Sequence, residues 1–227
     1  MTEDEYAPYL AAYADFLADH LPRYLAIEQR VYSPTFGFAG TLDRVAIIDG
    51  RCGVLDLKCT SRLHPETGLQ LAAYQLAWNE DGGECAFDPE THVYTDADGV
   101  IVPGVTRIIE QLGVYDGVPV EIMERASKRG TDIHALCEEI DHNNWRPYIP
   151  DWPIAKARWA LRLCPDGSYE FKEYDRDDDA MAFIACLQIY RWKEAVASNR
   201  NPRGTQLTTN DLAATLEWSQ RSNANMG

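Results

Sequence analysis

The stretch GFAGTLDRVAIIDGRCGVLDLKCT, residues 37–60, decides the fold. Apolar and polar residues alternate in its first half, which is typical of a strand with one buried face. Asp49-Gly50 follows, and this dipeptide favours a two-residue hairpin turn. The sequence therefore predicts a β-hairpin whose strands run over residues 36–48 and 53–60.

The predicted return strand carries two charged residues, Asp56 and Lys58. Residues two apart share one face of a strand, so both point the same way while Leu55 and Leu57 face the other side. With the turn placed as above, Asp43 on the first strand lies near the level of Asp56. Two carboxylates and an ammonium are costly to bury without neutralisation. A divalent cation, which prefers oxygen ligands, would supply it.

Further residues extend this pattern on both sides of the hairpin. Glu28 precedes it, G-x-x-G-T-x-D ends at Asp43, V-x-D-x-K spans residues 54–58, and Q-x-x-x-Y runs from Gln70 to Tyr74. In this order the series resembles the PD-(D/E)XK nuclease superfamily, and within it the RecB-like and lambda-exonuclease-like branch of phage-type recombination exonucleases. The resemblance implies an α/β (α+β mixed) fold with a restriction-endonuclease-like core, in which helices flank a central mixed β-sheet.

The resemblance also implies roles for particular residues. The implied catalytic set is Glu28, Asp43, Asp56, Lys58, Gln70 and Tyr74. The implied ligands of Mg²⁺ or Mn²⁺ are Asp43, Asp56, the carbonyl of Leu57, Glu28 and His134. Lys58 would orient the attacking water or stabilise developing charge, because neighbouring carboxylates disfavour a neutral lysine.

Ordinary structural roles are the alternative for each strand residue. Asp43 could pair with Arg44 or with a neighbouring lysine. Asp56 and Lys58 could form a solvated pair worth less than about 1 kcal/mol. Glu28 could be a plain surface glutamate. The apolar neighbours of Asp56 favour a central strand over an exposed one.

A helix is predicted over residues 69–79, and Gln70 and Tyr74 lie one turn apart on it. Their alternative role is ordinary helix packing. Residues 81–90 have the composition of a linker. A short hairpin turning at Asp98-Gly99 is predicted next.

A helix begins near Val105, and a long one covers residues 120–141. The phrases V-P-G-V-T and R-G-T-x-I-H also resemble this nuclease group, in which a histidine from an upstream helix joins the acids as a metal ligand. His134 is the matching residue. A lone histidine on a helix is otherwise structural.

The order of the segments departs from that of the relatives. There the G-T-x-x-H segment precedes the catalytic hairpin, whereas here residues 86–150 follow the helix of Gln70. The linker can span roughly 30 Å when extended, and a compact chain of this length has a radius of gyration of about 17 Å. The segment is therefore able to dock in its usual place, and the sequence leaves open whether His134 reaches the acids.

Three basic residues of the long helix share one face: Arg125, Lys128 and Arg129. They are candidates for contact with a DNA backbone or a terminal phosphate, and a solvated basic patch is the alternative. The apolar stripe predicted on the same helix consists of Ile122, Met123, Ala126, Ile133, Cys137 and Ile140.

The composition favours one domain with a sizeable core: 227 residues, 45% of them hydrophobic, with a net charge of −15. That charge excludes nucleic-acid binding by bulk attraction but allows a local basic strip with bound metal. The six cysteines are scattered, so we expect reduced thiols in a cytoplasmic protein and no iron–sulfur cluster. No apolar run is long enough to span a membrane.

Residues 1–200 are expected to form a single nuclease domain. Its parts are a helix over residues 3–20, core motifs in 24–80, the His-containing segment 86–150, and a final hairpin and helix in 154–198, with Phe183, Tyr190 and Trp192 in the core. Residues 201–227 form a polar tail, expected to be partly disordered beyond a short helix over 207–218.

The leading functional hypothesis is a metal-dependent DNA exonuclease that acts on double-stranded DNA with free ends in phage-type recombination. A structure-specific or restriction-type endonuclease on the same fold is one alternative. A DNA-binding module without catalytic activity is another. The sequence predicts no membrane partner, and it does not show whether the protein forms a homo-oligomer or works with a single-strand annealing protein.

Overall fold

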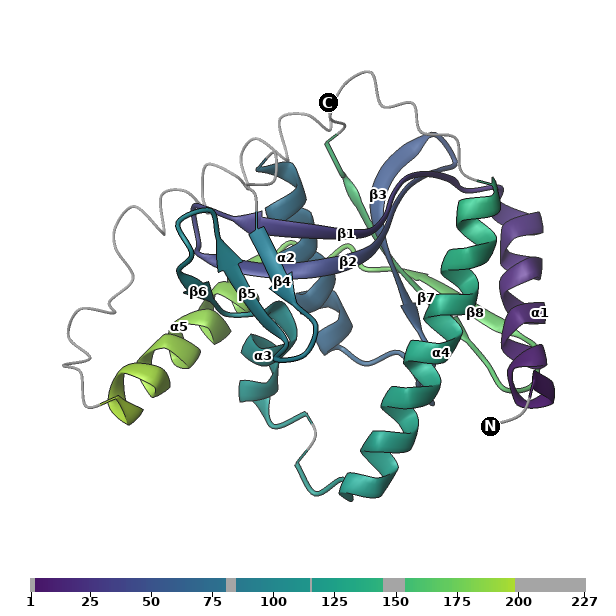
Figure 1. Cartoon of the computed structure of the whole chain (residues 1–227). Coiled ribbons are helices and arrows are strands. Elements are labelled where there is room, and N and C mark those ends of the chain that lie inside the picture. Colours follow the sequence, from purple (N-terminus) through teal and green to yellow (C-terminus); the bar gives the residue numbers. More distant parts are fainter. Residues whose placement is uncertain (1–2, 81–84, 115, 145–153, 199–227) are drawn as a thin grey trace.

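A five-stranded mixed sheet forms the centre of the molecule (Figure 1). The structure is a computed structural model that describes residues 3–80, 85–114, 116–144 and 154–198. Neighbouring strands are antiparallel except β3 and β7, which are parallel. In spatial order the strands are β1 (Arg23–Ser33), β2 (Phe38–Ile48), β3 (Arg51–Lys58), β7 (Ala157–Leu163) and β8 (Tyr169–Glu173).

The predicted hairpin is present, and its turn has the predicted chemistry. Asp49 and Gly50 both have positive φ, 51° and 75°, as a two-residue turn between twisted strands requires. Pairing of β2 with β3 runs as far as Arg44 opposite Leu55. Asp43 lies one position beyond that pair and therefore level with the next residue of β3, as the sequence predicts.

Helices cover both faces of the sheet, which confirms the predicted fold class (Figure 1). Leu55 and Leu57 of β3 join the core cluster that includes residues of α1 (Glu3–His20) and α4 (Val120–Asn144). Val54 faces the other cluster, built with α2 (Glu66–Asn79), α3 (Val105–Ile109) and α5 (Asp179–Ala197). The alternation along β3 thus separates two cores, and it places the side chain of Asp56 on the α2 side.

A smaller antiparallel sheet lies beside β1 and β2. It consists of β4 (Cys85–Asp88), β5 (Val93–Asp96) and β6 (Ile101–Val102), and the 3-10 helix Glu110–Leu112 follows α3. The predicted turn at Asp98-Gly99 is confirmed, but the predicted linker over 81–90 is wrong in its second half, where β4 forms. The hydroxyls of Tyr94 and Thr41 are 3.0 Å apart and join this sheet to β2.

Other differences lie at helix ends. The helix of Gln70 begins at Glu66, three residues earlier than predicted. Trp192 of α5 is 52% exposed, so its predicted place in the core is wrong. The apolar stripe of α4 holds in its second half, where Ile133 and Cys137 are buried, whereas Ile122 is 51% exposed. The N-terminal half of α4 extends past the sheet, which leaves its apolar side chains without a core to join (Figure 1).

Some expectations concern residues outside the described ranges. The polar tail 201–227, with the helix expected over 207–218, is among them, as is the end of the segment 86–150. All six cysteines are described, and each is a free thiol. In the described part of the chain, no helix combines the length and the apolar character needed to cross a membrane.

Candidate active site

The site forms at the C-terminal end of β3, where regular pairing with β2 stops. The carboxylate of Asp43 accepts a hydrogen bond from the backbone N–H of Leu57 at 2.7 Å. The Asp43 side chain thus replaces the backbone carbonyl of β2 that would otherwise accept this hydrogen bond, at the point where the two strands separate. The Leu57 carbonyl lies 3.1 Å from Nε2 of His134, so both backbone polar groups of Leu57 contact residues of this site.

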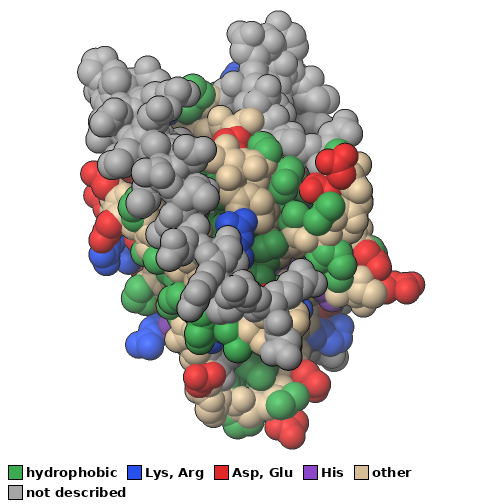
Figure 2. Space-filling model, turned by 90° about the vertical axis from the view of Figure 1, so that its left-hand side faces the viewer, with side chains coloured by type: hydrophobic (Ala, Val, Ile, Leu, Met, Phe, Trp, Pro, Cys, Tyr) green, Lys and Arg blue, Asp and Glu red, His purple; other side chains and the backbone are tan. Residues whose placement is uncertain are grey.

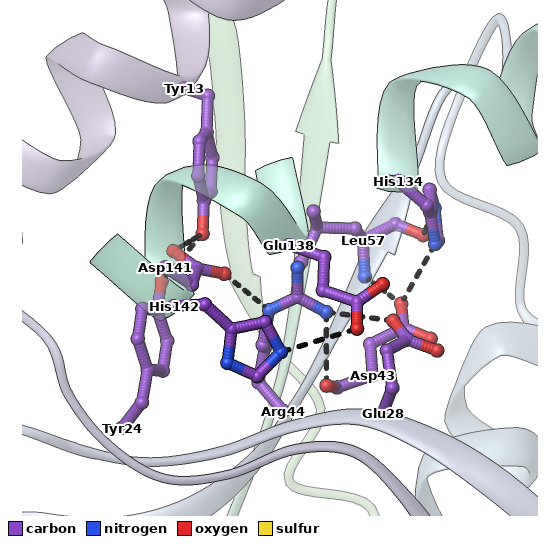
Figure 3. A network of polar contacts seen from close by, with 10 residues as sticks. All are labelled: Tyr13, Tyr24, Glu28, Asp43, Arg44, Leu57, His134, Glu138, Asp141 and His142. Carbon is purple, nitrogen blue, oxygen red and sulfur yellow. Dashed lines mark hydrogen bonds and ion pairs between the residues drawn. The ribbon is translucent and has the colours of Figure 1, made fainter. Parts of the chain in front are cut away.

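Glu28, Asp43 and His134 converge around this point, although they come from β1, β2 and α4 (Figure 3). One ligand atom from each lies within 4.8 Å of the others. Nδ1 of His134 is 3.7 Å from Oδ2 of Asp43. The segment that carries His134 therefore docks beside the acids in spite of its position in the chain.

Glu28 occupies an unusual backbone conformation for this role. Its φ is +46° in the middle of β1, a region that non-glycine residues rarely adopt. Such a conformation costs on the order of 1–3 kcal/mol and clusters at functional sites. The side chain is 31% exposed and 2.9 Å from Nη1 of Arg44, so the interpretation as a plain surface glutamate is wrong.

A second group of contacts runs from β3 to α2. Nζ of Lys58 lies 2.6 Å from Asp56 and donates to the amide oxygen of Gln70 at 2.9 Å. The amide nitrogen of Gln70 donates to the hydroxyl of Tyr74 at 3.2 Å. Asp56 is 1% exposed, so the solvated-pair alternative is wrong. Tyr74 is also buried, so its ring packs in the core while its hydroxyl accepts the hydrogen bond from Gln70.

Burial sets the electrostatics of these groups. It raises the pKa of Glu28 to about 7, an effect that the charge of Asp43 reinforces and Arg44 opposes. Burial also raises the pKa of Asp56, against the attraction of Lys58. Burial lowers the pKa of His134 and favours its neutral, ligating form. Clustered carboxylates beside a neutral imidazole and a backbone carbonyl make a donor set that fits a hard divalent cation.

The structure separates the predicted metal ligands into two positions. Glu28, Asp43 and His134 stand together, with the Leu57 carbonyl beside them. Asp56 is not one of these three, and its carboxylate is paired with Lys58.

Of the three basic residues of α4, Arg129 comes nearest to the site. Its Nη2 donates to the carbonyl of Cys59, the residue after Lys58, at 3.3 Å. Lys128 pairs instead with Asp132 at 2.9 Å, and Arg125 is exposed. On the coloured part of the face in Figure 2, acidic and basic side chains lie in small separate groups. This face is on the α5 side of the molecule, and its described residues form no broad basic surface.

Two residues that the sequence did not single out as functional complete the site. Arg44 is fully buried, and its Nε lies 2.6 Å from Asp141 of α4. The alternative that Asp43 pairs with Arg44 is wrong, because Arg44 donates to the Asp43 backbone carbonyl and pairs with other carboxylates. The signal for Arg44 was present, since an arginine within an apolar strand needs a buried partner.

The sheet order and the flanking helices match the restriction-endonuclease-like core that the sequence predicts. The sequence of residues 2–101 matches a model of the PD-(D/E)XK nuclease superfamily. This match supports the superfamily and, in general terms, a metal-dependent nuclease. It covers the core motifs and ends before α4, so the RecB-like and lambda-exonuclease-like branch stays a prediction. No curated protein matches the chain.

Proposed function

We propose that this chain is a Mg²⁺- or Mn²⁺-dependent exonuclease that hydrolyses double-stranded DNA from free ends in phage-type recombination or DNA processing. The observation that carries the proposal is the meeting of two groups at one strand end. Glu28, Asp43 and His134 lie on one side, and the Asp56–Lys58 pair with its α2 partners lies on the other.

The first group is suited to hold a cation. Asp43, His134 and Glu28 would bind it, with the Leu57 carbonyl beside them, while the Asp56 carboxylate stays paired with Lys58. When bound, the cation would neutralise charge on the phosphate oxygens and lower the pKa of a bound water.

The second group is suited to orient the reacting atoms. The carboxylate of Asp56 favours the charged form of Lys58, so the ammonium donates hydrogen bonds and stabilises negative charge instead of acting as a base. The hydrogen bond from Lys58 to Gln70 fixes the direction of the side chain, and Tyr74 in turn fixes Gln70.

The substrate would approach past the N-terminal half of α4. Arg129 stands next to the catalytic strand and is placed to contact a phosphate, while Arg125 and Lys128 would contact the backbone further along the same helix. Because the whole chain has a net charge of −15, attraction for DNA would come from local basic residues such as these three. DNA binding should therefore weaken as the salt concentration rises.

The test is degradation of linear double-stranded DNA with Mg²⁺, with Mn²⁺ and with a chelator. Lys58→Ala and Asp43→Asn should each lower the rate by at least about 10²-fold. Lys193→Ala, at an exposed lysine of α5, is the matched control and should retain full activity.

The outcomes separate the functional hypotheses. Metal-dependent loss of linear DNA with intact closed circles supports the exonuclease, whereas cleavage of circles favours the endonuclease. Tight DNA binding without turnover favours the binding module. Wild-type activity in the Lys58→Ala variant would refute the proposed site.

A further inference from the structure

A buried polar network joins the metal-ligand cluster to two helices (Figure 3). The hydroxyl of Tyr13 on α1 donates to Oδ1 of Asp141 at 2.6 Å, and the hydroxyl of Tyr24 is 2.8 Å from that of Tyr13. The other oxygen of Asp141 lies 2.6 Å from Nε of Arg44. Both charged side chains are almost fully buried, at 0% and 1% exposure.

The guanidinium of Arg44 acts on two sides at once. Its Nε edge meets Asp141, while Nη1 donates to Glu28 Oε1 at 2.9 Å and to the Asp43 backbone carbonyl at 3.0 Å. A planar fork with fixed donors can hold both sides in one orientation, which a single ammonium cannot do. The arginine therefore lies between the helix that carries His134 and the strand that carries Glu28.

We propose that Arg44 is a positioning residue that holds the Glu28 carboxylate against Asp43 and His134, and that Asp141 sets the orientation of Arg44. This inference rests on the proposed function, because it assigns the ion pair to the assembly of that metal site. Its consequence is that docking of α4 does two things together: it delivers His134 and, through Asp141, orients Arg44 toward Glu28.

The sign of the charge effect separates positioning from simple electrostatics. Arg44 is a positive charge close to a cation site, so by Coulomb repulsion alone its removal would tighten cation binding. Positioning predicts the opposite, because Glu28 loses the donor that holds it. Removing Arg44 and Asp141 together leaves the net charge unchanged and takes away the nearer positive charge, so simple electrostatics then predicts an unchanged or slightly tighter affinity.

The experiment measures Mn²⁺ binding to the full chain by titration calorimetry, without DNA, so the readout does not depend on activity. The test variant is Arg44→Met with Asp141→Leu, since a buried ion pair replaced by apolar residues usually leaves a stable fold. We expect Mn²⁺ to bind about 10–100-fold more weakly, the usual effect of losing a partner that orients a metal ligand.

Two further variants complete the design. Arg44→Lys keeps the charge but not the fork, so its affinity should also fall below that of the wild type. It decides the question alone if the double variant fails to melt cooperatively. Arg158→Met with Asp179→Leu removes the buried pair between β7 and α5 and is the matched control. Its Mn²⁺ affinity should not change.

Each outcome has one meaning. Wild-type affinity in the folded double variant, or in Arg44→Lys, overturns the positioning role while leaving the proposed function intact. An equal loss in the Arg158 control also overturns it, because the effect would then follow from lost packing. A wild-type protein that binds no Mn²⁺ overturns the proposed function together with the inference.

Discussion

Neutralising Glu28 should stabilise the metal-free protein, and only at high pH. Burial raises the pKa of this carboxyl from 4.5 to about 7, with repulsion from Asp43 adding to the effect. The folded state therefore holds the proton more tightly than the unfolded chain. The contribution of protonated Glu28 to stability is full below pH 4.5 and is lost as the pH rises through about 7. Glu28→Gln removes this loss.

The magnitude follows from the same values. At 1.36 kcal/mol per pKa unit, a rise from 4.5 to about 7 corresponds to an upper limit of about 3.4 kcal/mol. The side chain is 31% exposed, so solvent screening reduces this to about 2 kcal/mol. For a domain of this size, about 2–4 °C per kcal/mol gives a gain in Tm of about 4–8 °C. Asp56 is present in both proteins, so its own titration cancels in the difference.

Thermal unfolding in a chelator, measured by circular dichroism between about pH 5 and pH 8.5, tests this prediction. The wild type and the Glu28→Gln variant should melt within about 1 °C of each other at the acidic end and separate at the alkaline end. Glu139→Gln, at an exposed position of α4, controls for the loss of one charge. A difference in Tm that does not change with pH would refute the reasoning, since the raised pKa would then not act on stability.

Two further predictions concern packing and orientation. Gly53→Ala should destabilise the fold by about 2–3 kcal/mol in chemical denaturation, because a Cβ there would lie 2.6 Å from the Ala157 carbonyl oxygen and 2.4 Å from the Trp159 ring. Gly130→Ala, where a Cβ meets nothing within 4 Å, should instead stabilise α4 by about 0.5–1 kcal/mol, and equal effects at the two sites would contradict the packing argument. Tyr74→Phe removes the acceptor for Gln70 and should slow DNA degradation about five-fold, the value of one neutral hydrogen bond, without changing Mn²⁺ affinity. An unchanged rate would mean that Gln70 does not need this partner.

The hairpin and its acids could be predicted because their information is local. Asp49-Gly50 fixes the turn, the turn fixes the register, and the register places Asp43 level with Asp56. The parallel pairing of β3 with β7 could not be predicted in this way. Gly53 pairs with Ala157 across about a hundred residues, and no periodicity in either strand encodes its partner. Strand β4 was not predicted, because it has only four residues between turn-forming ones. Such a short segment shows too little alternation of apolar and polar residues to indicate a strand.

The sequence predicted which residues form the site better than it predicted how they are arranged. Motif spacing suggested Glu28 and His134, but the left-handed backbone that turns Glu28 toward Asp43 has no signature at a glutamate. The contact of Arg44 with Asp141 joins residues 97 apart in sequence. A charged residue in an apolar strand indicates that a buried partner is needed, but only the tertiary structure shows which residue that partner is.

The docking of α4 against the sheet does not depend on where its segment stands in the chain. His134 and Asp141 are seven residues apart, two turns of helix, so they lie on one face with the buried Cys137 between them. This face contacts the sheet at two points: His134 contacts the Leu57 carbonyl, and Asp141 contacts the Arg44 guanidinium. These contacts depend only on the residues that the helix presents on this face, so they can form whether α4 precedes or follows the hairpin in the chain. The connection sets only the entropy of loop closure, which grows slowly with length. An ion pair buried at 0% and 1% exposure adds little net stability, because desolvation offsets its attraction, whereas a docking that left either charge without its partner would be costly. We infer that the pair acts mainly on the specificity of docking.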